Sequence, residues 1–206
     1  MEPKIERLCR RDATPRIETR DDGVSLLVGY AAVFFREDDP ATQYELRPGL
    51  VERIERGAFA RAIVEGHDVR ALFNHDANQV LGRVPDTLSL VEDAIGLRYT
   101  IVLPDTQLGR DLAALVARGD ITGSSFSFMV RAKRDDKLVD GTRVWTLLDV
   151  DLYDVGPVTF PAYEATTAET RARLEREARE SALRAEIAAV AKEIRRFVVD
   201  RESANR

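Results

Sequence analysis

The sequence predicts a mainly β domain with flanking helices (α+β), built as an antiparallel sheet or barrel and followed by a C-terminal amphipathic helix. Two observations support this prediction. Short runs of β-forming residues follow one another at close spacing between residues 69 and 103, as is typical of antiparallel sheets and barrels. Near residues 162–167 the mixed, β-like sequence gives way to a segment rich in Ala, Arg and Glu, which favours a helix.

Composition limits the class of protein. The chain has 206 residues, of which 44% are hydrophobic and 33% charged, a globular composition. No apolar run reaches the roughly 18 residues of a membrane span, and the first residues lack the apolar core of a signal peptide. We therefore expect neither segment, and a cytosolic location. The net charge of −5 disfavours direct nucleic-acid binding, and the single Cys9 excludes an internal disulfide and a cysteine-rich zinc site.

The chain divides into three predicted parts. Residues 1–23 are a polar, flexible leader, residues 24–165 a globular domain, and residues 166–206 a charged helical extension. Apolar residues recur in the extension at steps of four, three, four and three, which is the a/d spacing of a coiled coil. This seam covers only about two heptads, so a helix docked on its own domain fits equally well. Its members are Leu183, Ile187, Val190, Ile194 and Phe197.

Periodicity defines the elements within the domain. Residues 57–66 and 104–120 have helical spacing, with Gly66 and Gly119 as their stops and Asp105 or Thr106 as the cap of the second helix. The apolar faces are Phe59, Ala62 and Ile63 in the first helix, and Leu108, Leu112, Leu115 and Val116 in the second. Strands are predicted at 24–35 with a break at Gly29, and at 42–47, 50–54, 69–75, 79–84, 87–93, 96–103, 125–133 and 142–155.

Several familiar sites are absent from the sequence. It contains no GxGxxG after a strand, no GxxxxGK[ST] and no HExxH. His67 and His75 are each followed by Asp, but no metal-ligand spacing recurs. We therefore predict no cofactor and no metal. His67 fits a solvated turn, whereas His75 ends an apolar strand, where a rigid element can hold the imidazole toward a cleft.

The stretch GSSFS at residues 123–127 holds three candidate nucleophiles. A serine hydroxyl reacts only when a positioned imidazole takes its proton and a third group orients that imidazole. Strand alternation places Ser125 and Ser127 on one face and Ser124 on the other. An α/β-hydrolase elbow is excluded, because that motif leads into a helix and precedes its histidine, whereas here a strand follows and the histidine comes first.

Six blocks of the sequence together resemble the prohead maturation proteases of tailed bacteriophages. The blocks are GYAAVFF, IERGAFARAI, ALFNHDANQVLGRV, EDAIGLRYTIVLP, LVARGDITGSSFSFMV and LYDVGPVTFPAYEATTA. Their order and spacing agree with that family over about residues 24–168. The resemblance implies an assemblin-like antiparallel β-barrel, related to the herpesvirus capsid proteases.

The resemblance also implies a set of site residues. His75 matches the catalytic histidine, Ser125 the nucleophile, and Asp154 an acidic position that is the candidate third member. The chain departs from the family pattern where Ser127 replaces a usual glycine, Gly156 a common serine, and Tyr163 a frequent asparagine. Ser127 is therefore an alternative nucleophile, and the alternative acids are Asp76, Asp149 and Asp151.

The function that the resemblance implies is that of a serine endopeptidase. It would cleave scaffold or major capsid protein delta segments, and itself, as a homo-oligomer inside the assembling procapsid in the host cytoplasm. The extension at 166–206 would be a scaffold-like or capsid-docking element, with a solvated amphipathic helix as the alternative. One rival is a capsid-assembly scaffold protein with a weak or inactive protease domain, which the presence of both His75 and Ser125 argues against. A non-viral β-barrel binding module is a second rival, disfavoured by the six ordered blocks.

Overall fold

The structure is a computed structural model that describes residues 5–9, 14–39 and 42–160. Contacts between Cα atoms divide the chain into two units, Met1–Tyr163 and Glu164–Arg206. All of the second unit lies outside the described residues. The predicted helical extension at 166–206, with its apolar seam, falls there.

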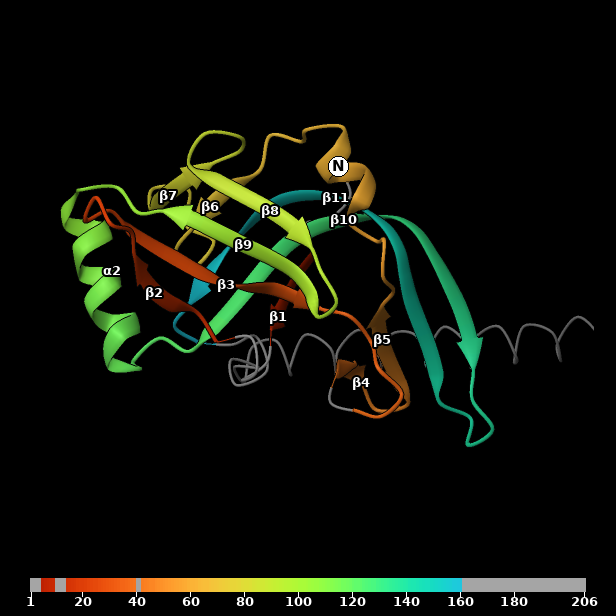
Figure 1. The fold of residues 1–206 in the computed structure, drawn as a ribbon. Helices are drawn as coiled ribbons and strands as arrows, with labels where there is room; N and C mark the ends of the chain where they lie inside the picture. The colour runs from red at the N-terminus through yellow and green to blue at the C-terminus, as the bar shows by residue number, and fades with distance from the viewer. Residues whose placement is uncertain (1–4, 10–13, 40–41, 161–206) are drawn as a thin grey trace, which may run out of the picture. The chain divides into compact units, whose positions relative to one another are not determined.

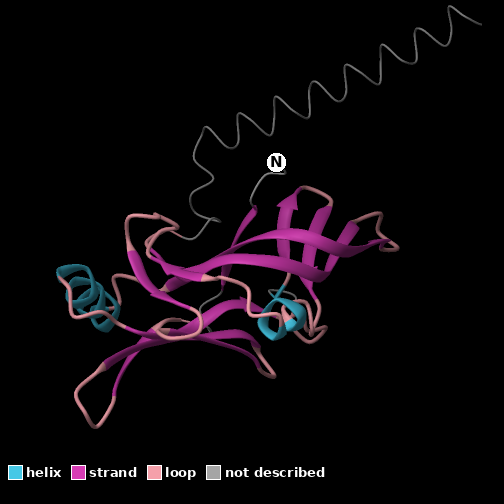
Figure 2. Ribbon diagram, turned by 90° about the horizontal axis from the view of Figure 1, so that it is seen from above, coloured by secondary structure: helices cyan, strands magenta, loops and turns pink. Residues whose placement is uncertain are grey.

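Strands form most of the described chain and are arranged in two sheets (Figure 1, Figure 2). The first sheet has the order β1 (Ile5–Cys9), β10 (Gly123–Lys137), β11 (Arg143–Val158), β5 (Leu50–Ile54) and β4 (Tyr44–Arg47), with β6 (Arg70–Leu72) and β7 (Val80–Arg83) attached through β11. The second has the order β2 (Arg16–Thr19), β3 (Ser25–Val33), β9 (Gly96–Val102) and β8 (Leu88–Glu92).

The long strands β10 and β11 organise the first sheet. They pair along most of their length as an antiparallel hairpin that extends beyond the rest of the ribbon (Figure 1). The 16 residues of β11 also leave room for two partners on its other edge, β5 along its first part and β6 along its last. This second pairing brings the loop after β6 next to the end of β11.

The prediction of a closed antiparallel barrel is wrong for the described residues, whose strands form two separately paired sheets. The first sheet is also mixed, because β5 and β6 both run parallel to β11. Close spacing between predicted strands indicates which neighbouring strands form hairpins. It carries no information on pairings between strands far apart in sequence, such as β5 and β11, and those pairings decide whether a sheet closes.

Two strands lie within residues 1–23, where the sequence predicted a flexible leader. β1 pairs with β10 at the edge of the first sheet, and β2 pairs with β3 at the edge of the second. Polar segments of this kind lack a strong apolar pattern of their own, but an existing sheet edge supplies backbone donors and acceptors for them. Ile17 adds partial burial against the core.

Aromatic rings fill the core beneath β10. Phe126 and Phe128 stack at 4.8 Å, and Phe59 meets Phe126 edge-on at 5.4 Å. All three residues are fully buried, and burying each such side chain contributes about 1.5–3 kcal/mol. On the same side of the strand, the hydroxyls of Ser124 and Tyr99 of β9 share a hydrogen bond of 2.7 Å. Since strand side chains alternate, the positions between them face the opposite side of the sheet.

Both predicted helices are confirmed. α1 (Ala60–Val64) buries Ala62, and Gly66 follows it at a φ of 65°. α2 (Gln107–Arg118) begins after Thr106, whose hydroxyl accepts from the N–H of Gly109, and ends at Gly119, whose φ of 81° suits a glycine C-cap. In Figure 2 α2 lies at the left margin of the strands, and α1 lies near the middle of the view. Neither described helix is both long and apolar enough to cross a bilayer.

Candidate active site

The loop between β6 and β7 presents His75. The loop is tight, because the N–H of Phe73 donates to the carbonyl of Gln79 at 3.0 Å and the N–H of Gln79 donates to that of Asp76 at 2.9 Å. Asn74 and His75 both have positive φ, at 55° and 56°. Two consecutive non-glycine residues in this region are uncommon and cluster at functional sites, where the surroundings must hold them in place.

Asn74 supplies that support. Its N–H donates to the carbonyl of Pro157 at 3.1 Å. Its side-chain amide donates to the Thr159 hydroxyl at 3.0 Å and accepts from the Thr159 N–H at 2.7 Å. The loop is thus fastened to the end of β11. Sequence reasoning missed this role, although an asparagine directly before the histidine was a usable signal, since Asn adopts positive φ more readily than most residues.

The imidazole of His75 lies between a carboxylate and a hydroxyl. Its Nδ1 is 2.5 Å from Oδ1 of Asp154 on β11, and its Nε2 is 2.8 Å from Oγ of Ser125 on β10. When Nδ1 carries the proton and donates it to Asp154, Nε2 accepts from the Ser125 hydroxyl. The three residues predicted from the sequence are therefore brought together, from one loop and two neighbouring strands.

This cluster is largely shielded from solvent. Ser125 is 3% exposed and Asp154 2%, and the His75 side chain is 12% exposed. A buried carboxylate needs strong partners. Asp154 bonds to His75 and to the hydroxyl of Ser127, which donates to Oδ2. In such low-dielectric surroundings hydrogen bonds to charged groups are strong, so the imidazole orientation is well fixed.

The alternatives that the sequence left open have other contacts. Ser127 lies opposite Asp154 in the β10–β11 ladder and bonds to its carboxylate. Asp76 accepts from the N–H and side-chain amide of Asn78. Asp149 and Asp151 both accept from Arg61. The geometry therefore favours Ser125 as the hydroxyl beside the imidazole, and Asp154 as the acid.

Gly156 allows the close approach that positions the histidine loop. It pairs with Ser125 on β10, and a Cβ at this position would collide with the backbone carbonyl oxygen of Leu72 at the end of β6. Any side chain would push β6 away from β11. This close approach accounts for the glycine at this position of the chain.

The second histidine belongs to a separate ionic cluster. Nε2 of His67 lies 3.2 Å from Glu65 and 3.3 Å from Arg61. The hydrogen bonds that Arg61 donates to Asp149, Asp151 and Glu65 raise its pKa. Among the described residues no three His, Cys, Asp or Glu side chains form a group that could hold a metal ion.

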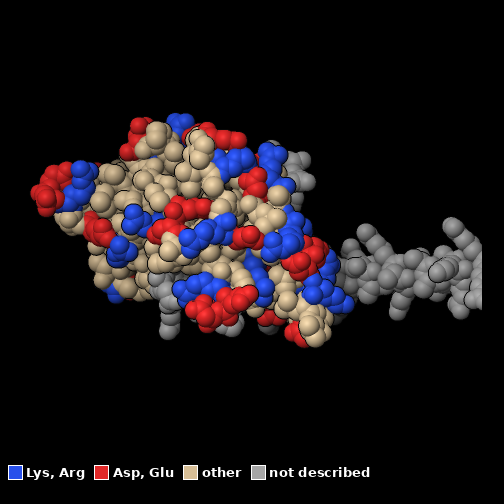
Figure 3. Space-filling model, turned by 45° about the vertical axis from the view of Figure 1, so that its right-hand side comes forward, with Lys and Arg blue, Asp and Glu red and all other residues tan. Residues whose placement is uncertain are grey.

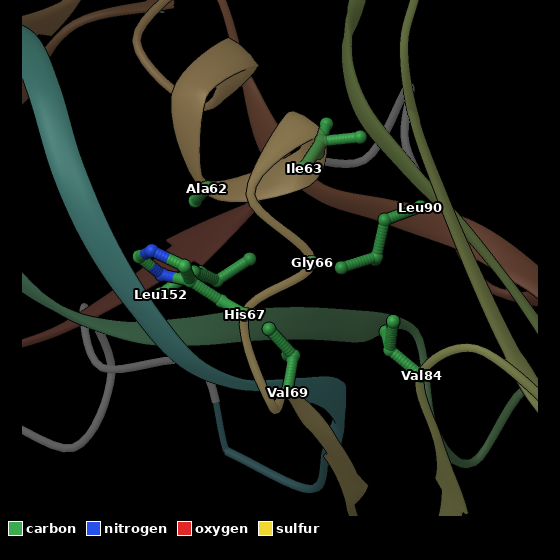
Figure 4. A pocket seen from close by; sticks show the side chains of 8 residues that line it. All are labelled: Ala62, Ile63, Gly66, His67, Val69, Val84, Leu90 and Leu152. Atoms are coloured by element: carbon green, nitrogen blue, oxygen red, sulfur yellow. The ribbon is translucent and has the colours of Figure 1, made fainter.

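His67 is also one of the residues that line a small, mostly apolar pocket beside α1. Figure 4 shows the side chains of Ile63, Val84, Leu90 and Leu152 around it. None of the three residues of the hydroxyl–imidazole–carboxylate cluster lines this pocket. Apart from His67 its lining is apolar, and no nucleophile or carboxylate lines it, so the candidate site is the cluster at Ser125.

Surface charge gives no sign of a large basic patch on the face drawn in Figure 3, where Lys and Arg side chains are interspersed with Asp and Glu. Many charged side chains of the described residues are paired. Arg134 bonds to Glu55 and Asp136, and Arg143 to Asp135.

A serine hydroxyl, an imidazole and a carboxylate in this order form the relay by which serine hydrolases activate their nucleophile. A family model described as caudovirus prohead serine protease matches residues 13–180 of this chain. The chain therefore belongs to the caudovirus prohead serine protease family, as its sequence blocks predicted.

A comparison with solved structures also finds a structural likeness. The chain is similar to the bacteriophage T4 capsid assembly protease, gp21, with 14% sequence identity and a TM-score of 0.44, over 75% of this chain and 96% of that one. No curated protein matches the chain.

Proposed function

We propose that this chain is a serine endopeptidase that cleaves scaffold or major capsid delta segments, and itself, during procapsid maturation. The observation that carries the proposal is His75 held between Asp154 and Ser125 at 2.5 and 2.8 Å, in a chain of the prohead protease family. The site of action would be the interior of the assembling procapsid in the host cytoplasm, with capsid and scaffold segments and further copies of the chain as partners. The extension at 166–206 would serve as a scaffold-like or capsid-docking element of this enzyme.

The proposed reaction is acyl transfer to Ser125. Nε2 of His75 takes the hydroxyl proton while Oγ attacks the scissile peptide carbonyl, and the resulting imidazolium then gives this proton to the leaving amine. Water, deprotonated by the same imidazole, releases the acyl group and regenerates the hydroxyl. Asp154 accepts from Nδ1 throughout, which fixes the tautomer and stabilises the imidazolium.

The test is intact-mass analysis of the full chain, incubated alone and with the matching capsid protein or assembled procapsid. The wild type, Ser125→Ala and Ser127→Ala are compared. We expect cleavage by the wild type and by Ser127→Ala, and none by Ser125→Ala. Cleavage lost only in Ser127→Ala would move the nucleophile by two residues. A wild type that cleaves neither capsid protein nor procapsid would favour the rival proposal of a scaffold protein with an inactive protease domain.

A further inference from the structure

Both edges of the strand that carries Ser125 are occupied. On one edge β11 pairs with β10, with Gly156 opposite Ser125. On the other edge lies β1, whose Leu8 stands opposite Ser125 and whose Cys9 stands opposite Ser124. β1 is the outermost strand of the order β1-β10-β11-β5-β4.

In this arrangement the Ser125 hydroxyl is closed to a substrate. The residue is 3% exposed, whereas a scissile carbonyl must come within about 3–3.5 Å of the nucleophile. Access therefore requires a neighbouring segment to move.

The two neighbours of β10 differ in what their displacement would cost. β11 carries Asp154 and, through Pro157, holds the loop of His75. Moving β11 would therefore take Asp154 and the loop of His75 away from Ser125. β1 carries none of the three residues, so its departure leaves Ser125, His75 and Asp154 in place. The β1 edge is thus the approach that preserves the chemistry.

We propose that the edge of β10 held by β1 is the binding surface for the substrate peptide, which pairs with β10 as an extended strand in place of β1. This inference rests on the proposed function. Strand addition draws its affinity from main-chain hydrogen bonds, and β1 shows that this edge accepts a strand over five consecutive pairs, from Ile5–Phe128 to Cys9–Ser124. The family match begins at residue 13, so β1 precedes the part shared with the family.

The test weakens β1 in the full chain and follows the reactivity of Ser125. Successive N–H groups of a strand point to opposite edges, so one of two adjacent residues must donate toward β10. The double variant Glu6→Pro/Arg7→Pro therefore removes at least one donor, because proline lacks an N–H. Its matched control is Glu18→Pro/Thr19→Pro in β2, an edge strand of the other sheet.

The readout is the rate at which a fluorophosphonate modifies Ser125, measured by intact mass and peptide mapping. We expect the β1 variant to react at least tenfold faster than the wild type, and the β2 variant to react at the wild-type rate. A synthetic peptide of residues 1–12 should restore slow modification of the β1 variant, and the same peptide with proline at positions 6 and 7 should not. Equal rates in all three proteins, or no effect of the peptide, would overturn the inference while leaving the protease proposal intact. Absence of Ser125 modification in every protein would overturn both.

A second measurement on the wild type covers the case in which the β1 variant does not fold. Excess peptide of residues 1–12 competes with β1 for the same edge, so hydrogen exchange at residues 5–9 should become at least threefold faster while exchange at residues 16–19 stays unchanged. Unchanged exchange at residues 5–9 would contradict an edge that accepts an external strand.

Discussion

The ring of His75 has a different partner at each nitrogen, and the chemistry of the site depends on that difference. Asp154 accepts from Nδ1 at 2.5 Å, which leaves Nε2 free of its proton and 2.8 Å from the Ser125 hydroxyl. The base is thus oriented and held in the required tautomer before substrate arrives. Such preorganisation removes a reorganisation cost from the reaction.

Asp154→Asn tests the role of the carboxylate. The amide keeps the size of the side chain but can donate to Nδ1, which places the ring proton on Nε2 and blocks acceptance from Ser125. We expect kcat to fall by about 10⁴-fold with KM little changed, measured on a peptide from the capsid cleavage site. A loss of less than about tenfold would show that the acid does not set the tautomer.

Ser127→Ala tests the second partner of Asp154. It removes one donor from a buried carboxylate, an interaction of about 1.5–3 kcal/mol, part of which orients His75. We expect kcat to fall by about tenfold with an unchanged KM. The matched control is Ser124→Ala, which removes a buried hydroxyl that bonds to Tyr99 on the opposite face. Equal losses of kcat in the two variants would indicate a general packing effect.

The sequence predicted the members of this site better than the contacts that position them. Strand alternation correctly separated Ser124 from Ser125 and Ser127, because the period of a strand is fixed. It could not choose between Ser125 and Ser127, or among four aspartates, since that choice depends on how a loop folds across two strands. Asn74 and Thr159 escaped notice because they act on the histidine loop and not on substrate.

At the scale of elements, the hairpin of β10 and β11 and the short strand β6 form the frame of the site. β11 contacts β10 on one edge and β6 on the other, and Gly156 lies where β6 comes closest. The distance from His75 to Ser125 therefore depends on how tightly β6 approaches β11.

Gly156→Ala tests that dependence. The added Cβ would meet the carbonyl oxygen of Leu72, so β6 and the following loop must shift, at a cost of about 1–3 kcal/mol in the free energy of unfolding. We expect kcat to fall more than tenfold, because small displacements of a reacting group are costly. The control is Gly141→Ala in the hairpin turn, where φ is 90° and the Cβ meets nothing. The Gly141→Ala variant should lose about 1 kcal/mol in the free energy of unfolding and keep the wild-type kcat.

The sequence largely predicted which segments form helices and strands, but it did not predict how the strands pair into sheets. The helix caps at Thr106 and Gly119 and the strands between residues 25 and 102 follow from local patterns. The predicted strand ended at residue 133, whereas β10 continues to Lys137, since pairing with β11 orders polar residues that have no apolar pattern. The parallel pairings of β11 and the pairing of β1 with β10 likewise depend on partners far away in the chain.

At the scale of the whole molecule, ion pairs reinforce the contacts between neighbouring elements. Arg61 of α1 and Arg131 of β10 both donate to Asp151 of β11. Burial alone would raise the pKa of Asp151, but the hydrogen bonds from the two arginines outweigh it and lower this pKa below the ordinary 3.8. The folded protein thus binds the Asp151 proton more weakly than the unfolded chain does.

The sign of this shift predicts an acid-dependent contribution to stability. Since the pKa is depressed in the folded state, Asp151 stabilises the fold at pH values above its ordinary pKa, and this stabilisation is lost as the pH falls through the folded value. In urea unfolding, the stability difference between wild type and Asp151→Asn should be largest near about pH 6 and shrink toward about pH 2. A pH-independent difference for Asp151→Asn would contradict this assignment.

The central claim is that His75 activates Ser125 for attack, and covalent labelling tests it most directly. The full-length wild type and His75→Ala are treated with a fluorophosphonate, and the modified residue is located by peptide mapping. The relay predicts one phosphonyl group, on Ser125, and its loss in His75→Ala. Modification at another residue, or equal modification of Ser125 without His75, would contradict the claim.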